Sequence, residues 1–471
     1  MVRVSSVLAG LLALIVSTMV QAESPWLAIV GGTVIDGSGQ PPRPHTTVLI
    51  NGERIAAVGP AGDIDVPSEA RIVDAAGKWV IPGLIDAHVH FFQSGGLYTR
   101  PDLIDLRAIA PFKEQIEQVR EQLPETFARY IASGVTSVID GGGPFWTFDV
   151  RALAERIPRA PRVAATGPIL ANAPPPLLQE LDDPPMLAVV SAESAREAVA
   201  RLMPYKPDMI KIWLVQSDRP LDQEMAWVRA VTAAARAAGL PVLAYTKELA
   251  LAHVLVAAGA DVVVHSISDL PIDGILLNAM KQNNVVSVST LAVDESYRQV
   301  FNGQNSVLEI ERRLGDPAAL ASLSRPSMLP LDGPAALPIL PALPADSSDI
   351  AAANLRRLHG YGIAVAAGSD AGNIGMLHGP ALHRELELMV AAGLTPMQAL
   401  VAATRGGAIA MHRQSELGSL NAGKLADVVV LDDDPLRDIS NTQKIRHVVK
   451  NGLVFDPEEI VRELRLEKSP S

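Results

Sequence analysis

An α/β protein built around a (β/α)8 TIM barrel is predicted from two features: a regular alternation in the middle of the chain and short β-rich runs at both ends. The middle of the 471-residue chain holds eight apolar runs that suit buried parallel strands. Most of these runs are separated by stretches with helical spacing of apolar residues. A doubly wound sheet fits the same alternation, but no G-x-G-x-x-G motif opens a helix, so we favour the barrel.

The composition is that of a globular protein with a large core. Hydrophobic residues make up 48% of the chain and charged residues 20%, which excludes the disordered class. The formal net charge of −12 and the absence of any Lys/Arg run argue against nucleic acid as a partner. Cysteine is absent, so thiol nucleophiles, disulfides and cysteine-based zinc sites are excluded and histidine, carboxylate and lysine remain as metal ligands.

The first 22 residues have the features of a Sec signal peptide. Arg3 gives a positive start, residues 7–16 are apolar, and residues 20–22 place small side chains at a cleavage site before Glu23. We therefore expect residues 1–22 to be removed on export, leaving a periplasmic or secreted protein without a membrane segment. The alternative is an uncleaved anchor, for which the apolar run is short.

Short β-rich runs at the two ends of the chain predict one small antiparallel β-sandwich, formed where the termini meet. Its N-terminal part, residues 23–80, contains runs separated by Gly, Asn and Pro turns, at 27–34, 47–50, 54–58 and 70–73. Its C-terminal part, residues 414–471 including a tail, contains the runs 426–431, 447–450 and 453–455. Asn451-Gly452 between the last two runs is a hairpin signal.

The barrel is expected at residues 81–413. Its predicted strands are 80–85, 135–139, 162–165, 209–214, 242–245, 262–265, 285–290 and 363–368. In such a barrel the chemistry lies at the carboxyl ends of the strands. Residues 293–348 interrupt the alternation with a stretch rich in Pro, Ala and Leu. We interpret this segment as a lid-like insertion over the barrel mouth, with a solvated insertion without a role as the alternative.

Five residues at or near predicted strand ends have the chemistry of metal ligands. His88 and His90, at the end of the first barrel strand, are two residues apart, so both imidazoles face the same side. His265 ends the sixth strand, Asp370 ends the eighth, and Lys211 lies within the fourth. A buried lysine is costly unless it is paired, modified or deprotonated. Each residue alone would suit a structural role, but together they predict a site for a divalent metal.

The segments around these residues resemble the amidohydrolase superfamily, nearest its imidazolonepropionase-like and Xaa-Pro/Xaa-Arg dipeptidase branch. The resemblance covers nearly all of the chain after residue 22 and rests on residues 31–37, 82–88, 385–396 and 423–431. It implies a metal-dependent hydrolase with Zn²⁺ as the first choice among divalent metals and with one or two ions. It also implies the ligands: His88, His90 and Asp370 for one ion, and a carboxylated Lys211 that bridges to a second ion bound also by His265.

One position departs from the family pattern. Tyr245 stands where the family has its strand-five histidine, and His253 falls within the following helix. The second metal therefore loses a ligand, and we expect a weakened second site. Three roles stay open for Tyr245: a phenolate ligand, a hydrogen-bond donor to the substrate carbonyl, or a neighbour of a single-metal site in which Lys211 is unmodified.

The resulting hypothesis is a metal-dependent hydrolase that cleaves an amide- or peptide-type C–N bond in a small-molecule substrate. A divalent ion lowers the pKa of bound water toward about 7, Asp370 is expected to act as general acid and base, and Tyr245 or the metal to polarise the carbonyl. Two alternatives remain: a lactone, ester or cyclic-imide hydrolase using the same site, and an exported binding protein with a degenerate metal site. The sequence is also compatible with a homo-oligomer.

Three further polar residues follow predicted strands. His378 is a candidate for substrate contact or for packing, and His383 is expected to pack. Asp140 ends the second strand before three glycines, where it would border the pocket or cap the turn. The remaining histidines, at positions 45, 359, 412 and 447, carry no functional signal.

Overall fold

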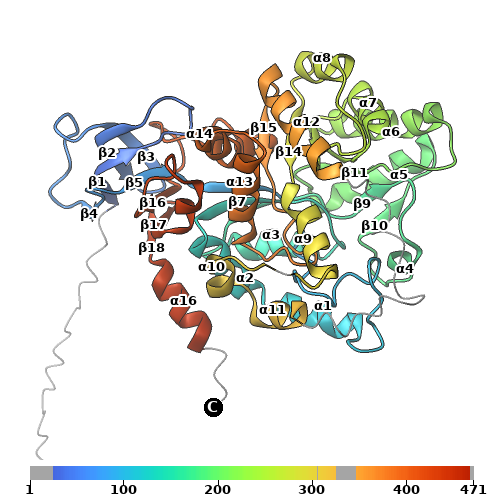
Figure 1. Cartoon of the computed structure of the whole chain (residues 1–471), viewed down its shortest axis with the longest axis horizontal. Coiled ribbons are helices and arrows are strands. Elements are labelled where there is room, and N and C mark those ends of the chain that lie inside the picture. The colour runs from blue at the N-terminus through green and yellow to red at the C-terminus, as the bar shows by residue number, and fades with distance from the viewer. Residues whose placement is uncertain (1–24, 305, 325–345, 467–471) are drawn as a thin grey trace, which may run out of the picture.

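The computed structural model describes residues 25–304, 306–324 and 346–466. The predicted signal peptide, residues 1–22, and most of the Pro-rich stretch of the predicted insertion lie outside the described residues. Figure 1 shows a barrel with its surrounding helices beside a smaller sheet that contains both the first and the last strands of the chain. Among the described helices, none combines the length and apolar character that crossing a membrane would need.

All eight predicted barrel strands are present and run parallel to their neighbours. They are β6 (Leu84–Val89), β7 (Val135–Asp140), β8 (Arg162–Ala165), β11 (Ile210–Trp213), β12 (Val242–Tyr245), β13 (Val262–Val264), β14 (Val286–Ser289) and β15 (Val365–Ala367). Hydrogen bonds join them in two arcs, β6-β7-β8 and β11 through β15. The second arc continues beyond β11 into two short strands, β9 (Ile169–Ala171) and β10 (Met186–Ala188). The prediction of a (β/α)8 barrel is confirmed.

Backbone hydrogen bonds just after β15 close the barrel against β6. The N–H of Asp370 donates to the carbonyl of His88 at 2.8 Å, and the N–H of His90 donates to the carbonyl of Ala371 at 2.8 Å. These bonds lie at the carboxyl ends of the first and last strands. Barrel closure therefore brings together two segments that are far apart in the sequence.

The first predicted strand, residues 80–85, is divided in the structure. Its first half is β5 (Trp79–Pro82), which pairs with β16 (Val428–Leu431) in the sheet of the chain ends, whereas the barrel strand β6 begins at Leu84. Gly83 joins the two, and a Cβ at this position would lie 2.3 Å from Thr136 Oγ1. Because both halves are buried, the apolar run gives no sign of the change of sheet.

The strands of the two chain ends form one sheet in the order β18-β17-β16-β5-β1-β2-β3, with β4 also on β1. The remaining strands are β1 (Trp26–Val34), β2 (Arg43–Asn51), β3 (Arg54–Pro60), β4 (Arg71–Asp74), β17 (Ile445–Lys450) and β18 (Leu453–Phe455). The termini meet as predicted, but β1 pairs in parallel with β4 and β5, so the sheet is mixed rather than purely antiparallel. Ile29, Val48 and Val430 share one core in it.

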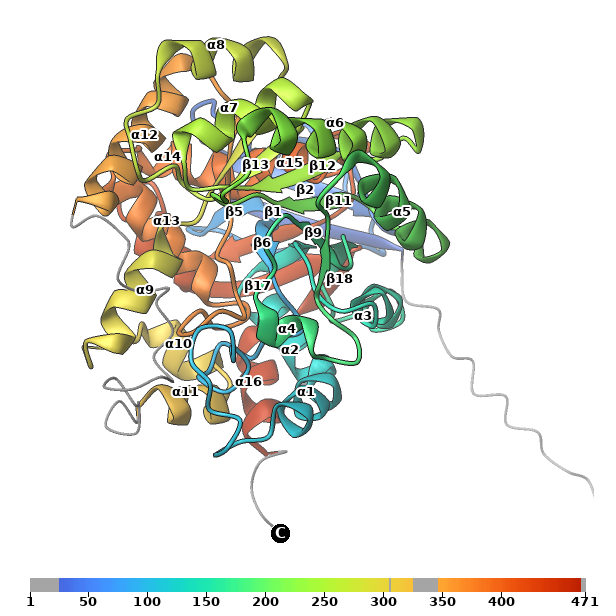
Figure 2. The same ribbon diagram turned by 90° about the vertical axis from the view of Figure 1, so that its right-hand side faces the viewer.

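Helices cover the outside of the barrel (Figure 2). The larger ones are α1 (Phe112–Glu121), α2 (Leu123–Ala132), α3 (Thr147–Ala154), α5 (Ala192–Leu202), α6 (Leu221–Ala237), α7 (Leu249–Ala258), α8 (Gly274–Gln282), α12 (Ser347–Tyr361), α13 (Ala381–Ala391) and α16 (Pro457–Leu466). Shorter ones are α4 (Pro176–Gln179), α14 (Pro396–Val401) and α15 (Gly407–Ala410). In α6, Trp227, Val231 and Ala235 recur every four residues and are fully buried, which gives the helix its barrel-facing side.

The described part of the predicted insertion forms three helices, α9 (Leu291–Phe301), α10 (Glu309–Leu314) and α11 (Pro317–Leu323). Val300 in α9 and Leu323 in α11 share an apolar cluster with Leu97 and Leu103 in the loop after β6 and with Leu377 after β15. These helices therefore form a wall at the carboxyl ends of β6 and β15. A movement of the segment as a lid stays a prediction.

Candidate metal centre

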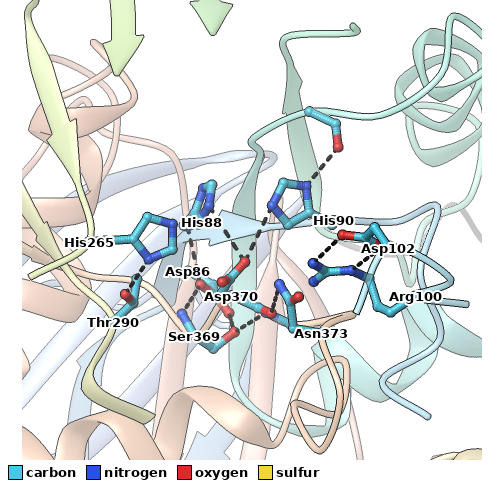
Figure 3. Close-up of polar contacts among 12 residues, drawn as sticks. Asp86, His88, His90, Arg100, Asp102, His265, Thr290, Ser369, Asp370 and Asn373 are labelled. Carbon is cyan, nitrogen blue, oxygen red and sulfur yellow. Dashed lines mark hydrogen bonds and ion pairs between the residues drawn. The ribbon is translucent and has the colours of Figure 1, made fainter. Parts of the chain in front are cut away.

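Three of the predicted ligands meet at the carboxyl end of the barrel (Figure 3). Nε2 of His88 lies 3.6 Å from Oδ1 of Asp370, and Nε2 of His90 lies 3.3 Å from the same oxygen. One donor atom from each residue lies within 4.8 Å of the other two. The side chains are almost completely buried. His88 lies in β6, His90 follows that strand directly, and Asp370 lies in the turn after β15, so all three come from the two segments that barrel closure joins.

This donor set fits a divalent metal. Ligand atoms about 2.1 Å from a tetrahedral ion are about 3.4 Å from one another, close to the 3.3 and 3.6 Å measured here. Among the described residues, Oδ1 of Asp370 is buried and has no hydrogen-bond partner. Two imidazole nitrogens approach this oxygen without forming a hydrogen bond to it. A cation bound by all three atoms would give the oxygen a partner.

The ionisation of these side chains also suits metal binding. Burial, together with the charge of Lys211, brings the pKa of His88 well below its usual value. Burial alone would raise the pKa of Asp370, but the adjacent imidazoles of His90 and His88 hold that pKa well below its usual range. The site therefore offers neutral imidazole nitrogen and an ionised carboxylate, the forms that coordinate divalent cations.

Two of the imidazoles are fixed through Nδ1. Nδ1 of His90 lies 2.7 Å from the carbonyl of Gly142, to which it donates a hydrogen bond, so Nε2 is left free to accept and faces Asp370. Nδ1 of His265 lies 2.7 Å from the hydroxyl of Thr290. These contacts set the direction of each ring before any ligand binds.

His265 and Lys211 lie beside this three-residue group. The ring centroid of His265 is 5.1 Å from that of His88. Lys211 is 1% exposed, and its Nζ has no hydrogen-bond partner among the described residues. Burial lowers the pKa of Lys211 to about 7 against the opposing charge of Asp370. The structure thus places His265 and Lys211 close enough to interact electrostatically with Asp370, although Lys211 lies inside β11 rather than at its end.

The strand register places an apolar residue, rather than Tyr245, beside Lys211. Lys211 pairs with Leu243 across β11 and β12, and Trp213 pairs with Tyr245. Leu243 is fully buried in the barrel interior. Tyr245 lies closer to the mouth, with its ring centroid 4.6 Å from that of His265. Because burial raises the pKa of Tyr245, its hydroxyl is neutral, which favours hydrogen-bond donation over a phenolate ligand.

The two histidines after the eighth strand are held in the packing around the site. His378 accepts a hydrogen bond at Nδ1 from the hydroxyl of Tyr130 at 2.8 Å and donates through Nε2 to the carbonyl of Gln93 at 2.7 Å. His383 is buried and contacts Thr442 and the carbonyl of Ser133. Both rings therefore have their nitrogens occupied within the protein.

Asp140, the other candidate, ends β7 and is 1% exposed. The backbone N–H groups of Phe91 and Gly142 approach its carboxylate. Burial raises the pKa of Asp140 to about 8. Its carboxylate is therefore protonated and neutral near pH 7, and it does not belong to the group of three ligands.

Several residues that support the ligands were missed from the sequence. Tyr297 on α9 donates to Oδ1 of Asn373 at 2.6 Å, and Asn373 donates to the carbonyl of Asp370 at 3.3 Å. Arg100 donates to the Tyr297 hydroxyl at 3.2 Å and forms a bidentate ion pair with Asp102. These residues lie in loops and on an inserted helix, where no spacing rule gives a signal.

A second contact holds α9 at the barrel mouth. Lys247, two residues after β12, forms an ion pair with Asp294 of α9. Burial alone would lower the pKa of Lys247, but the carboxylate of Asp294 raises it. The lysine is therefore charged and already has a partner.

The model of the amidohydrolase family matches residues 79–454, which include the whole barrel and the C-terminal strands of the end sheet. The chain belongs to the amidohydrolase family. The resemblance stated from the sequence motifs is thereby confirmed.

Solved structures with the same fold cover almost the whole of this amidohydrolase. A Xaa-Pro dipeptidase with methionine bound in its active site has a TM-score of 0.69 at 22% identity, over 92% of this chain and 100% of that chain. The ochratoxinase of A. niger has a TM-score of 0.69 at 21% identity, over 92% of this chain and 96% of that chain. At such identities the likeness shows the fold.

Curated relatives match over short segments. An N-acyl-D-glutamate deacylase of Alcaligenes xylosoxydans xylosoxydans is 50% identical over 75 residues, 15% of this chain and 14% of that protein. A dihydroorotase of Anaeromyxobacter dehalogenans is 40% identical over 72 residues, 15% of this chain and 16% of that protein. The chain thus matches well under a quarter of the length of these relatives.

Proposed function

We propose that this amidohydrolase hydrolyses an amide-type C–N bond in a small substrate, such as a dipeptide or an N-acylated amino acid, with one divalent metal. The observation that carries the proposal is the buried group of His88, His90 and Asp370, whose spacing and ionisation suit a cation. The substrate class is supported by the names of similar proteins, a Xaa-Pro dipeptidase and an N-acyl-D-glutamate deacylase.

The residues of the site divide the chemistry among them. His88, His90 and Asp370 would hold a divalent ion, which would lower the pKa of a bound water from 15.7 toward about 7. Asp370, ionised in the resting site, accepts the proton of the attacking water and then donates it to the leaving nitrogen. Tyr245 keeps its proton and can donate a hydrogen bond to the carbonyl oxygen of the substrate.

We favour a single ion over two. Leu243 occupies the position beside Lys211 on the fifth strand, and a leucine side chain offers no donor atom to a second ion. Lys211 would then stay unmodified, and its lowered pKa allows it to be buried without a charged partner. Among divalent metals we propose Zn²⁺, because two imidazole nitrogens and one carboxylate oxygen are donors that zinc prefers.

The test is metal analysis joined to an assay of activity. The purified protein is expected to carry one ion per chain, to lose hydrolysis of dipeptides or N-acylated amino acids on chelation, and to recover it with Zn²⁺. Hydrolysis that survives complete removal of metal would contradict the proposal. Two ions with a bicarbonate-dependent activity would instead indicate a carboxylated Lys211, and turnover confined to lactones, esters or cyclic imides would indicate the alternative substrate class.

Export to the periplasm or the medium is a separate proposal, supported by the charge, apolar run and small residues of residues 1–22. Expression of the full chain in a bacterial host with a Sec system should give a mature N-terminus at Glu23 in the periplasmic fraction. N-terminal sequencing that finds residues 1–22 still attached would contradict it.

A further inference from the structure

We propose that Asp86 is a positioning residue of the metal centre, whose carboxylate holds His88 and Asp370 at the separation that a metal requires. The inference rests on the proposed function in that it concerns the same metal site. Asp86 lies in β6, two residues before His88, and is fully buried. Figure 3 shows Asp86 between His88 and Ser369, beside Asp370.

The carboxylate of Asp86 is bonded to both halves of the site. Oδ1 accepts hydrogen bonds from the backbone N–H of Ser369 at 2.8 Å and from that of His88 at 3.3 Å. Oδ2 accepts from the hydroxyl of Ser369. Asp86 therefore holds His88 through its backbone N–H, and it holds Asp370 through Ser369, the residue before it.

The turn that Asp86 holds has an unfavourable backbone. Asp370 has a φ of 57°, in the left-handed region, which residues other than glycine adopt only at an energetic cost. The hydroxyl of Ser369 gives its proton to Asp86 and accepts from the N–H of Ala371 at 3.1 Å, so hydrogen bonds flank Asp370 on both sides. Without Asp86, the turn would lose two of the contacts that keep Asp370 in this conformation.

Asp86 itself is not placed to bind the ion. Three donors already converge on its two oxygens, and it does not belong to the group whose donor atoms lie within 4.8 Å of one another. Its effect on the metal is therefore expected to act through His88 and Asp370. Loss of residues that orient metal ligands typically weakens metal binding by about 10- to 100-fold.

The experiment compares metal binding by Asp86→Ala, Asp86→Asn and Ser369→Ala with the full-length wild type. Each protein is freed of metal, and its Zn²⁺ affinity is measured by competition with a chromogenic chelator. The absorption spectrum of the Co²⁺-loaded protein reports the coordination geometry. We expect Asp86→Ala to weaken binding about 10- to 100-fold and to change the Co²⁺ spectrum. We expect Asp86→Asn, whose amide oxygen still accepts from both backbone N–H groups, to stay close to wild type, with Ser369→Ala between the two.

Glu224 offers a matched control. It is also a buried carboxylate that accepts from a serine hydroxyl, Ser217 at 2.6 Å, but its other partners are Asn172, Arg219 and Trp227, none of them a metal ligand. Glu224→Ala should lower thermal stability without changing the Zn²⁺ affinity or the Co²⁺ spectrum. A merely structural role for Asp86 would make the two alanine variants behave alike.

The outcomes separate this inference from the proposed function. Wild-type affinity and spectrum in Asp86→Ala, or an equal loss in Glu224→Ala, would overturn the role of Asp86 while leaving the metal site intact. If Asp86→Ala does not fold, Ser369→Ala decides, and wild-type metal binding by that variant would overturn the role. A wild-type protein that binds neither Zn²⁺ nor Co²⁺ would overturn the proposed function and this inference together.

Discussion

At the scale of single residues, two side chains at or beside the candidate metal centre depend on a backbone conformation that most residues avoid. Asp370 has a φ of 57° and His265 a φ of 76°, although neither is a glycine. Each follows a barrel strand directly or nearly so, and a left-handed residue there turns the chain sharply at the strand end. The left-handed conformation at these two positions therefore lowers the free energy of unfolding, while it directs the two side chains toward the barrel mouth.

Replacing Asp370 by asparagine should remove most turnover and leave the fold intact. The amide has nearly the same shape but no charge, so it neither accepts the proton of water nor balances the charge of a cation. We expect activity to fall at least about 100-fold, with the unfolding midpoint of the metal-free protein nearly unchanged. Steady-state kinetics and denaturant unfolding measure the two effects. Wild-type-like turnover would remove Asp370 from its proposed role.

Asp140 should make stability depend on pH. Its pKa is about 8 in the folded protein and near 3.8 in the unfolded chain, so between these values unfolding releases a proton and stability falls as pH rises. Asp140→Asn lacks this proton. As the pH rises from 5 to 8, the free energy of unfolding of the variant minus that of the wild type should increase by up to about 1.4 kcal/mol per pH unit. Urea unfolding at several pH values measures these free energies. If the free energies of unfolding of wild type and Asp140→Asn changed equally with pH, the prediction would be contradicted. Asp149→Asn, which changes an exposed carboxylate, is the control.

The candidate metal site was predictable because parallel strands of a barrel bring their carboxyl ends together. His88, His90 and Asp370, which the structure brings together, were identified from their places at the ends of predicted strands. Asp86 gave a signal that was overlooked, a carboxylate inside an apolar strand like the lysine at 211. Its partner Ser369 was not predictable, because the bond spans 283 positions and exists only through barrel closure.

At the scale of elements, the register of β12 determines which of its side chains lies beside Lys211 and which lies beside His265. Counting along the sequence placed Tyr245 at the strand-five position. In the structure Tyr245 pairs with Val264, the residue before His265, and its ring centroid is 4.6 Å from that of His265. Pairing with β11 puts Leu243, two residues earlier, level with Lys211. Hydrogen-bond register between parallel strands leaves no trace in a single sequence, which is why the position of Leu243 beside Lys211 was not predicted.

Leu243→His should therefore create a ligand for a second ion. The imidazole would enter the barrel interior beside Lys211, and bicarbonate could then carboxylate the lysine. We expect the metal content to rise from one to two ions per chain when bicarbonate is supplied, as measured by elemental analysis. Leu243→Ile, which keeps the volume but adds no donor atom, should stay at one ion. An unchanged metal content in the histidine variant would contradict this reading of the register.

Helix α9 is expected to stabilise, through Tyr297, the turn after β15 that carries Asp370 and Asn373. Tyr297→Phe removes the hydroxyl that bonds Asn373 and Arg100, at a cost of about 1 kcal/mol. Hydrogen exchange should become faster in the turn around Asn373. Tyr361→Phe, which removes an exposed hydroxyl bonded to Asn278, is the control and should leave that turn unchanged. Equal exchange in the two variants would show that α9 does not support the site.

At the scale of the whole molecule, a buried ion pair fastens the barrel to the end sheet. Arg162 at the start of β8 pairs with Asp427, just before β16, and also contacts Asn451. The side chains of Arg162 and Asp427 are 13% and 6% exposed. The sequence predicted both bodies but not this contact, because the two residues are 265 positions apart and meet only when the barrel and the end sheet have folded.

Arg162→Ala should destabilise the protein by about 3 kcal/mol, because it leaves a buried carboxylate without its partner. Calorimetry is expected to show a lower melting temperature, with the barrel and end sheet still unfolding in one transition if they depend on each other. Arg446→Ala breaks an ion pair with Asp432 that is about half exposed and should change little. If Arg162→Ala lowered the melting temperature no more than Arg446→Ala, the ion pair between Arg162 and Asp427 would not contribute to stability.

The pairing of β5 with β16 has a consequence for biosynthesis. Val80 faces Val430, so a ribosome making about 5 to 20 residues per second needs roughly 20 to 70 s to deliver the partner of a strand already synthesised. During that interval the edge of β5 is open to pairing with other nascent chains. The protein is therefore expected to depend on chaperones that shield its early strands until translation is complete.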